Sequence, residues 1–274
     1  MLGAYIPQEV TTMLICPVCG ETLTLQERVY VCENGHSFDR AKEGYVNLLR
    51  TSKPGDSMGD DKFSARSRRD FLNRGYFAPL KDALVERFSD AEGSLLDICC
   101  GEGYYTAALA ENPKLTVYGF DLSREMVRLA AKRGGGTYFV ANMAAIPIES
   151  NSMDYATHLF APFHEPEFAR VLKPGGRLIT VVPGARHLFG LKALLYDTPY
   201  ENDEQLPPTT SLRLMQKDKV SARITLQTPA DIEAVFRMTP YYFHTSERDR
   251  AKLQGVEQLE TEIEFILGTY EKGD

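Results

Sequence analysis

The chain has 274 residues, 43% of them apolar and 25% charged, which is typical of a globular protein with one large domain or two unequal ones. This composition excludes disordered and fibrous proteins. The formal net charge of −7 argues against a protein whose whole surface binds polyanions, but it leaves room for a local basic patch.

The sequence indicates neither a membrane protein nor a secreted one. No run approaches the roughly 18 apolar residues of a spanning helix, and the N-terminal segment lacks the basic start and small-residue cleavage site of a signal peptide. Of the five cysteines, three form a metal-like cluster and two are adjacent, which favours a reducing compartment over a disulfide framework. We therefore expect a cytoplasmic protein.

The segment CPVCGETLTLQERVYVCENGH, residues 16–36, has the spacing C-x2-C-x12-C-x3-H. Thiolates and an imidazole at these spacings suit tetrahedral Zn²⁺, although incidental cysteines in turns or a redox C-x-x-C pair are alternatives. A DNA-reading finger has its last two ligands on a helix, whereas the Asn-Gly pair between them here predicts a turn. We predict a zinc ribbon whose closed site is structural, with the ligands Cys16, Cys19, Cys32 and His36.

Alternating residues at 22–25 and 28–31 predict two short strands within the ribbon. Residues 51–60, rich in Gly, Ser, Pro and Asp, predict a linker. Residues 61–74 form a helix-like segment with five basic and two acidic residues, a charge of +3, and with Phe63, Phe71 and Leu72 near one apolar side. Such a run is usually a solvated helix face, but in an acidic protein it is also a candidate phosphate-binding patch.

From residue 76 onward, helix-like and strand-like segments alternate. This alternation predicts an α/β fold with a doubly wound, parallel, Rossmann-like sheet. Beyond residue 183 the pattern weakens, apart from a helix near 229–238 and a final strand at 261–270. The earlier segments are helices at 80–88, 104–111, 123–133 and 165–172, and strands at 94–100, 115–122, 137–143, 153–160 and 177–183.

A glycine loop, LLDICCGEGYYT at 95–106, follows the first of these strands and opens a helix. Nucleotide-like ligands bind at this position in doubly wound sheets. Gly101 and Gly103 would allow the backbone to approach a ligand closely, and Asp121 ends the second strand, where it could accept hydrogen bonds from ribose hydroxyls. A glycine turn that only serves packing is the alternative.

Three features favour S-adenosylmethionine over NAD as the ligand of this loop. Thr106 occupies the position where a dinucleotide loop normally has a third glycine. Asp97, just before the loop, suits the cationic amino acid moiety of S-adenosylmethionine. The third feature is the segment VLKPGGRLI at 171–179, which precedes a later strand. The adjacent Cys99 and Cys100 are best explained by packing, because small buried cysteines are common.

Several of these segments together resemble the large-subunit (23S) ribosomal RNA (guanine-N1)-methyltransferase family. They are CPVCG…YVCENGHSFD, AKEGYVNLL, PGDS, FLNRGYFAPL, LLDICCGEGYYT, FARVLKPGG and VPGARHL. The resemblance implies an S-adenosylmethionine-dependent enzyme that methylates N1 of one guanine in a 23S rRNA hairpin, which in some members confers macrolide resistance. It implies zinc ligands at the four residues named above and cofactor contacts at Phe77, Tyr105, Thr106 and His187.

The resemblance also implies a class I methyltransferase fold with a small N-terminal zinc ribbon. We divide the chain into a zinc-ribbon RNA-recognition domain at 1–50, a basic linker and helix at 51–75, and a methyltransferase domain at 76–274. The expected partner is the rRNA hairpin, without DNA or membrane, and a homodimer is compatible with the family. The predicted cofactor site comprises Phe77, Asp97, Gly101, Gly103, Tyr105, Thr106, Asp121, Asn142 and His187.

The sequence does not identify the base that accepts the guanine N1 proton. The polar residues expected near the end of the fourth strand are His158, His164, Asp154 and Glu165. In the adjoining LFAPF segment, Phe160, Pro162 and Phe163 could enclose a flipped base or belong to the core. Two other functions stay open, namely a small-molecule or protein methyltransferase with a structural ribbon, and a non-catalytic RNA-binding protein.

Overall fold

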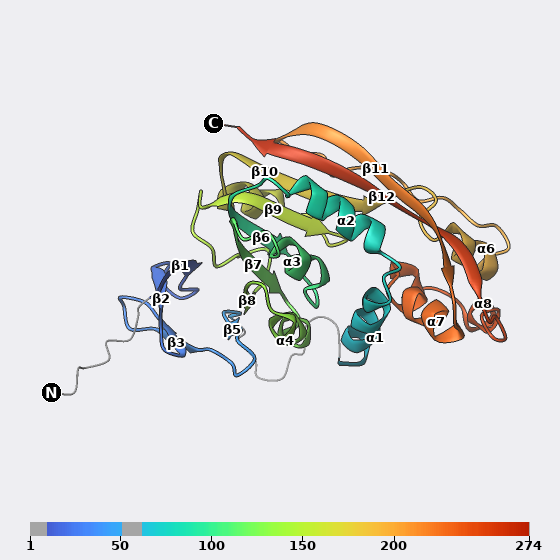
Figure 1. Cartoon of the computed structure of the whole chain (residues 1–274), viewed down its shortest axis with the longest axis horizontal. Coiled ribbons are helices and arrows are strands. Elements are labelled where there is room, and N and C mark those ends of the chain that lie inside the picture. The colour runs from blue at the N-terminus through green and yellow to red at the C-terminus, as the bar shows by residue number, and fades with distance from the viewer. Residues whose placement is uncertain (1–9, 51–61, 274) are drawn as a thin grey trace.

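The computed structural model describes residues 10–50 and 62–273, which form two β-sheets and the helices around them (Figure 1). The smaller sheet is antiparallel and confirms the two ribbon strands expected from the sequence, to which it adds two more at its edges. Its strands are β1 (Val10–Ile15), β2 (Thr22–Gln26), β3 (Val29–Val31) and β4 (Ser37–Asp39). The linker predicted at 51–60 lies outside the described residues.

The larger sheet has the strand order β11-β12-β10-β9-β6-β7-β8-β5. Strands β5 to β10 are parallel, and β12 runs antiparallel to both of its neighbours. The chain moves outward from β6 to β8 and then returns to β9 on the other side, so the switch point lies between β6 and β9. The strands are β5 (Val46–Asn47), β6 (Gly93–Ile98), β7 (Leu115–Asp121), β8 (Thr137–Val140), β9 (Met153–Leu159), β10 (Leu172–Pro183), β11 (Leu212–Leu226) and β12 (Leu259–Lys272).

The helices confirm every helical segment expected from the sequence. Ser123 caps its helix as predicted, since its side chain accepts a hydrogen bond from the N–H of Met126. Within the described ranges, no helix is long and apolar enough to cross a membrane. The helices are α1 (Lys62–Asn73), α2 (Ala78–Arg87), α3 (Tyr104–Leu109), α4 (Arg124–Arg133), α5 (Glu165–Val171), α6 (Phe189–Leu195), α7 (Pro229–Arg237), the 3-10 helix η1 (Pro240–Phe243) and α8 (Glu247–Ala251).

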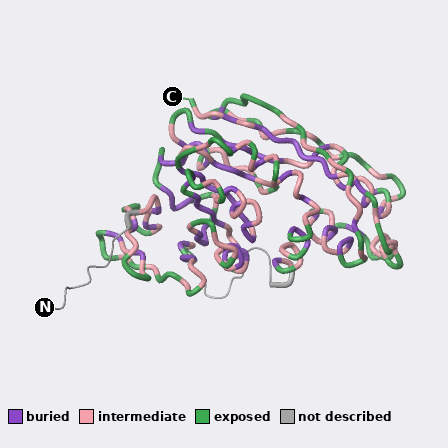
Figure 2. Tube along the Cα trace, viewed as in Figure 1, coloured by how far each residue is buried: buried purple, intermediate pink, exposed green. Residues whose placement is uncertain are grey.

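The two faces of the large sheet are covered differently. Side chains alternate along each strand, so Leu95 and Val117 face a core made with α1, α2, α3, α6 and α7. The neighbouring Leu96 and Tyr118 face a second core, to which α5 and the zinc ribbon contribute. Figure 2 shows the central strands as nearly continuous buried segments, as expected for parallel strands covered on both faces.

The zinc ribbon is attached to the segment between β8 and β9 by backbone hydrogen bonds, and to the large sheet by apolar packing. The N–H of Ile15 donates to the carbonyl of Pro147 over 3.0 Å, and the N–H of Glu149 donates to the carbonyl of Met13 over 3.0 Å. Val46, just after the ribbon, already pairs with β8. The structure therefore joins the ribbon to the α/β fold, and the domain boundary at residue 50 stays a prediction.

Gly190 sets how closely α6 packs on β12. Its N–H donates to the Thr261 hydroxyl over 3.1 Å, and a Cβ at this position would collide with the backbone carbonyl of Glu260. We expect Gly190→Ala to lower the free energy of unfolding by about 1–3 kcal/mol through overpacking. Urea denaturation tests this, with Gly273→Ala as the control because a Cβ there meets nothing within 4 Å. Equal midpoints for both variants would contradict the expectation.

Candidate cofactor site and metal centre

The four predicted metal ligands meet at one point. Their ligand atoms all lie within 4.8 Å of one another, and within the described ranges they are the only such cluster of Cys, His, Asp and Glu. The Sγ atoms of Cys19 and Cys32 are 3.7 Å apart, and the Nδ1 atom of His36 lies 3.4 Å and 3.6 Å from the Sγ atoms of Cys32 and Cys16. A tetrahedral Zn²⁺ with bonds of about 2.3 Å to sulfur and 2.0–2.1 Å to nitrogen requires edges of roughly 3.5–3.8 Å. The cluster therefore fits zinc.

Two tight turns aim these ligands at one ion. The N–H of Gly20 donates to the carbonyl of Cys16, and the N–H of Gly35 donates to the carbonyl of Cys32. Both glycines have positive φ, of 84° and 80°, a conformation that side chains disfavour. Each ligand pair thus lies on a turn, as predicted, and all four ligands come from the protein, which makes the site structural.

Asp121 connects the glycine loop to the next strand. One of its carboxylate oxygens accepts the N–H of Gly101 over 3.1 Å, and the other accepts the N–H of Ser123 over 2.8 Å. A Cβ at Gly101 would meet nothing within 4 Å, so this part of the loop is open, whereas a Cβ at Gly103 would press on Ala130. The loop therefore offers the half-buried backbone of Gly101 beside a fixed carboxylate, at the carboxyl ends of β6 and β7.

Asp97 lies behind the loop, with only 2% of its surface exposed. Its two carboxylate oxygens accept the hydroxyls of Thr106 over 2.5 Å and Thr157 over 2.8 Å. Burial raises the pKa of Asp97 to about 6. In this arrangement the carboxylate fixes the start of α3 against β9, and a direct contact with the cofactor stays a prediction.

Tyr105 provides a test of whether the loop fits a ligand. Its hydroxyl is buried and has no hydrogen-bond partner among the described residues. Burial raises its pKa well above the usual value, so the hydroxyl stays protonated. Because buried polar groups are almost always paired, an unpartnered hydroxyl on a residue in the first turn of α3, just after the glycine loop, is consistent with a bound polar ligand.

Phe77 and His187 lie in one aromatic group with Phe265. Phe77 is buried at the start of α2, and its ring centroid lies 5.7 Å from that of His187 and 5.3 Å from that of Phe265. The Nδ1 atom of His187 accepts the N–H of Glu264 over 3.3 Å. Burial, with a smaller effect from Lys192, lowers the pKa of His187 to about 3, so the ring is neutral and its proton is on Nε2.

Asn142 and the adjacent cysteines complete the edge of the loop. Asn142 follows β8, and its side-chain oxygen accepts the N–H of Ala144 over 2.9 Å. Neither Cys99 nor Cys100 belongs to the metal cluster. Cys99 lies 4.0 Å from the sulfur of Met143, and burial raises its pKa to about 12. The packing role expected for the two cysteines is consistent with this environment.

The polar residues expected near the end of the fourth strand do not all lie there. Asp154 is at the opposite edge, where it pairs with Lys173 and accepts a hydrogen bond from the N–H of Ser94, because it is the second residue of β9. That expectation was wrong. Glu165 is near the end of the strand but accepts backbone N–H groups of Thr210 and Ser211.

His158 is at the end of β9 but is not available as a base. Its Nε2 donates to the carbonyl of Pro162 over 3.0 Å, so its Nδ1 accepts the Thr180 hydroxyl over 2.8 Å. Burial lowers its pKa to about 4. The ring is therefore neutral, and it has a structural role in fixing the turn after β9.

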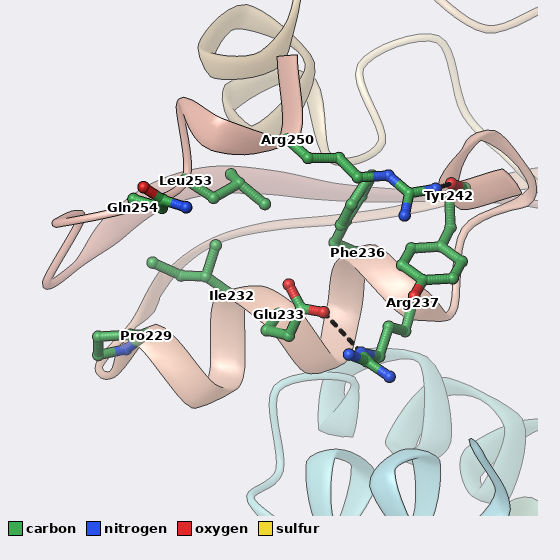
Figure 3. Close-up of a pocket in the computed structure, with 9 residues that line it drawn as sticks. All are labelled: Pro229, Ile232, Glu233, Phe236, Arg237, Tyr242, Arg250, Leu253 and Gln254. Carbon is green, nitrogen blue, oxygen red and sulfur yellow. Dashed lines mark hydrogen bonds and ion pairs between the residues drawn. The ribbon is translucent and has the colours of Figure 1, made fainter. Parts of the chain in front are cut away.

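A cavity of about 400 Å³ lies between α7 and α8, away from the glycine loop (Figure 3). Its arginines already have partners within the protein. Arg237 pairs with Glu233, and Arg250 stacks on Tyr242, 4.5 Å from the ring centroid, while donating to its carbonyl. Nothing in this cavity resembles the cofactor loop.

Removal of two metal ligands tests the metal centre. We expect Cys16→Ser with Cys19→Ser to reduce zinc from about one ion per chain to near zero, because thiolates provide most of the affinity. The thermal unfolding midpoint should also fall, since Cys16 belongs to the core that the ribbon shares with the large sheet. Metal analysis and calorimetry measure both. Cys99→Ser, which changes a thiol outside the cluster, should retain zinc; equal zinc in both proteins would contradict the site.

Comparisons with known proteins agree with this geometry. A family model described as the N-terminal part of RlmA, a zinc ribbon, matches residues 14–53, and a methyltransferase-domain model matches residues 95–176. The chain is 30% identical to a 23S rRNA (guanine(748)-N(1))-methyltransferase of Streptomyces fradiae, over 95% of this chain and 98% of that protein. A Bacillus subtilis protein with a provisional name of the same class is 34% identical over 69% of this chain and 71% of that protein.

A demethylmenaquinone methyltransferase of Shouchella clausii is 33% identical, but over only 36% of this chain and 48% of that protein. The matches to the ribbon and over nearly the whole chain confirm the predicted resemblance, the class I methyltransferase fold, the structural zinc and the use of S-adenosylmethionine. The chain belongs to the 23S rRNA (guanine-N1)-methyltransferase family.

Proposed function

We propose that this protein transfers a methyl group from S-adenosylmethionine to N1 of one guanine in a hairpin of 23S rRNA. The observation that supports this most strongly is the combination, in one chain, of a four-ligand zinc ribbon with an acid-anchored glycine loop at the sheet's switch point. A small-molecule methyltransferase needs only the second of these features. The ribbon provides a further surface for a large, folded substrate.

The cofactor site that we propose is the edge formed by the glycine loop, Asp121 and the Phe77–His187 aromatic group. When bound, S-adenosylmethionine supplies a methyl group activated on a sulfonium. Asp121 accepts ribose hydroxyls with its remaining lone pairs, and the unpartnered hydroxyl of Tyr105 donates to a polar group of the cofactor. The Nε2–H of His187 acts as a second donor, and the ring of Phe77 excludes water from one side.

Guanine N1 has a proton in its usual form, which must leave before or during methyl transfer. His158 and His187 are poor acceptors for it, because burial lowers the pKa of each ring far below neutral pH. Both ring nitrogens of His158 are also already hydrogen-bonded. We therefore propose that neither histidine is the base, and that the contribution of the protein to the transfer is mainly alignment of N1 with the methyl group.

The RNA is proposed to bind through phosphate and shape contacts with the ribbon and with the basic helix α1. Helix α1 packs on α3 and α4, which begin at the cofactor edge. Arg66 on α1 and Lys132 near the end of α4 are exposed. These cations give an acidic protein the local basic surface that a nucleic acid requires.

Methyl transfer can be assayed with 23S rRNA transcribed in vitro and labelled S-adenosylmethionine. A methyl group on N1 blocks Watson–Crick pairing, so we expect a single reverse-transcriptase stop at one hairpin guanine, which also identifies the hairpin. Label in RNA without such a stop, or no label in RNA, would contradict the proposal.

Asp121→Asn tests the cofactor site. It should weaken cofactor binding by about 10- to 150-fold, because it removes one charge-assisted hydrogen bond that contributes roughly 1.5–3 kcal/mol.

The matched control for that variant is Asp154→Asn. Asp154 is also a hydrogen-bonded carboxylate beside β6, but it lies at the opposite edge of the sheet. Calorimetric titration with S-adenosylmethionine should give the wild-type affinity for the control even if its stability is reduced. Similar weakening in both variants would mean that the loss reflects general destabilisation and not a ribose contact.

The proposal includes a homodimer. Within the described ranges β11 is an edge strand that pairs only with β12, and its Leu214 and Met215 are 46% and 48% exposed. The unpaired backbone groups of an edge strand can pair with another chain, and these two apolar side chains interrupt the otherwise charged face of β11. We expect sedimentation equilibrium to give twice the mass of one chain, and Met215→Lys to shift the protein towards the monomer. Val18→Lys, on the exposed ribbon turn, is the control; a monomer for the wild type at all concentrations would refute the dimer.

A further inference from the structure

Backbone strain is concentrated at the proposed cofactor edge. Five non-glycine residues in the described ranges have positive φ. Two of them, Cys99 and Phe160, directly follow β6 and β9, and a third, Leu188, lies after β10 at the start of α6. Unfavourable backbone conformations persist only where the surrounding structure imposes them, and they cluster at ligand-binding sites. Leu188 is buried in the core, so of the three only Cys99 and Phe160 can present a side chain to a ligand.

Phe160 is the most unusual of the three. Its φ is 57°, its backbone N–H donates to the carbonyl of Val181 over 3.1 Å, and yet its side chain is 42% exposed. The sheet thus holds the backbone in a strained conformation while a large apolar ring faces solvent. On one side the ring packs on Phe265, with centroids 5.6 Å apart, and this contact helps to fix the position of the ring.

The other members of the LFAPF segment serve the fold. The ring of Phe163 packs on Phe168 and His158, at centroid distances of 5.1 Å and 5.6 Å, and belongs to the core. Pro162 accepts the Nε2–H of His158 with its carbonyl, which fixes the turn after Phe160. Of the three candidates in this segment, Phe160 alone keeps a large exposed aromatic ring.

Phe160 is next to the proposed cofactor residues. In the sheet His158 pairs with Ile98, so Phe160 lies alongside the loop that begins at Cys99. Phe265, which supports the ring, also contacts Phe77 and His187 at 5.3 Å and 4.8 Å. One chain of aromatic contacts therefore links Phe77 and His187 of the proposed cofactor site to the exposed ring.

We propose that Phe160 is the stacking residue for the target guanine. This inference rests on the proposed function, because a guanine inside a hairpin must leave its stack to reach the cofactor. The exposed ring replaces the lost base–base stacking with stacking on an aromatic side chain. The strained backbone holds the ring in this exposed position and prevents it from packing into the core. The ring has no group that can accept a proton, so its contribution is to bind and orient the base.

Phe160→Leu and Phe160→Tyr test the stacking role in the full-length zinc-loaded protein with transcribed 23S rRNA. Stacking on one base contributes enough that its loss should reduce kcat/KM for RNA by about 5- to 150-fold in Phe160→Leu. Phe160→Tyr keeps the aromatic face and should retain activity close to that of the wild type. The affinity for S-adenosylmethionine should stay unchanged in both. Phe243→Ala, which removes another exposed ring (78%) on η1, should leave kcat/KM unchanged.

Phe160→Gly separates binding from stability. Glycine adopts positive φ without strain, so the thermal midpoint should stay the same or rise while activity falls at least as far as in Phe160→Leu. A lower midpoint together with the activity loss would mean that the ring is structural and would overturn the inference. Wild-type kcat/KM in the Leu and Gly variants would overturn it too, with the proposed function intact. No rRNA methylation by the wild-type protein would reject the proposed function and the inference together.

Discussion

A parallel sheet must be covered on both faces, and in this protein the second face determines the architecture. Six helices, α1, α2, α3, α4, α6 and α7, cover one face in the described structure. The other face of the central strands is covered by α5, a helix of seven residues, which is too short to bury Leu96, Tyr118 and Phe120 alone. The zinc ribbon supplies the remaining apolar surface through Leu14, Leu23 and Tyr30, all of them buried. The ribbon is therefore a layer of the fold as well as a candidate RNA-binding module.

This shared core couples the metal to the cofactor edge. Tyr30, in the strand just before the second ligand pair, belongs to the same cluster as Phe120, the residue before Asp121. The carboxylate of Asp121 in turn holds the glycine loop through the N–H of Gly101. Zinc stabilises the ribbon, the ribbon packs on β7, and β7 positions the acid that shapes the loop.

The sequence predicted those parts of the fold whose signals are local. The ligand spacing, the Ser123 cap and the apolar runs of β6 and β7 are all encoded within a few residues. Strand β11 was not predicted because its exposed face alternates charged residues such as Arg213, Lys217 and Arg223, so its apolar content is low and its partner, β12, lies far along the chain. Helix α6 was also missed, because its packing depends on Gly190 fitting against β12.

In the candidate site, too, local features could be predicted from the sequence and long-range ones could not. The glycine loop and Asp121 could be found from their spacing, but the states of the side chains depend on distant partners. Asp154 was expected at the wrong edge although the predicted strand, 153–160, already makes it the second residue, and residues early in a strand lie opposite its carboxyl end. The neutral state of His187 depends on burial and on the N–H of Glu264, 77 residues away in sequence. Neither the burial of His187 nor its hydrogen bond with Glu264 could be inferred from the VPGARHL motif.

The neutral groups at the proposed site have a common physical consequence. His187 and Tyr105 both present an uncharged donor in buried surroundings, and Asp121 places a carboxylate beside the open loop. A charged imidazolium beside a sulfonium would place two cations in a low-dielectric region, where their repulsion is larger than in water. Burial removes the charge from His187 before the cofactor arrives, so cofactor binding does not have to displace a proton from that ring. An edge of aromatic rings and neutral donors can therefore accept a cationic cofactor and a flat purine together, with Asp121 as the nearby opposite charge.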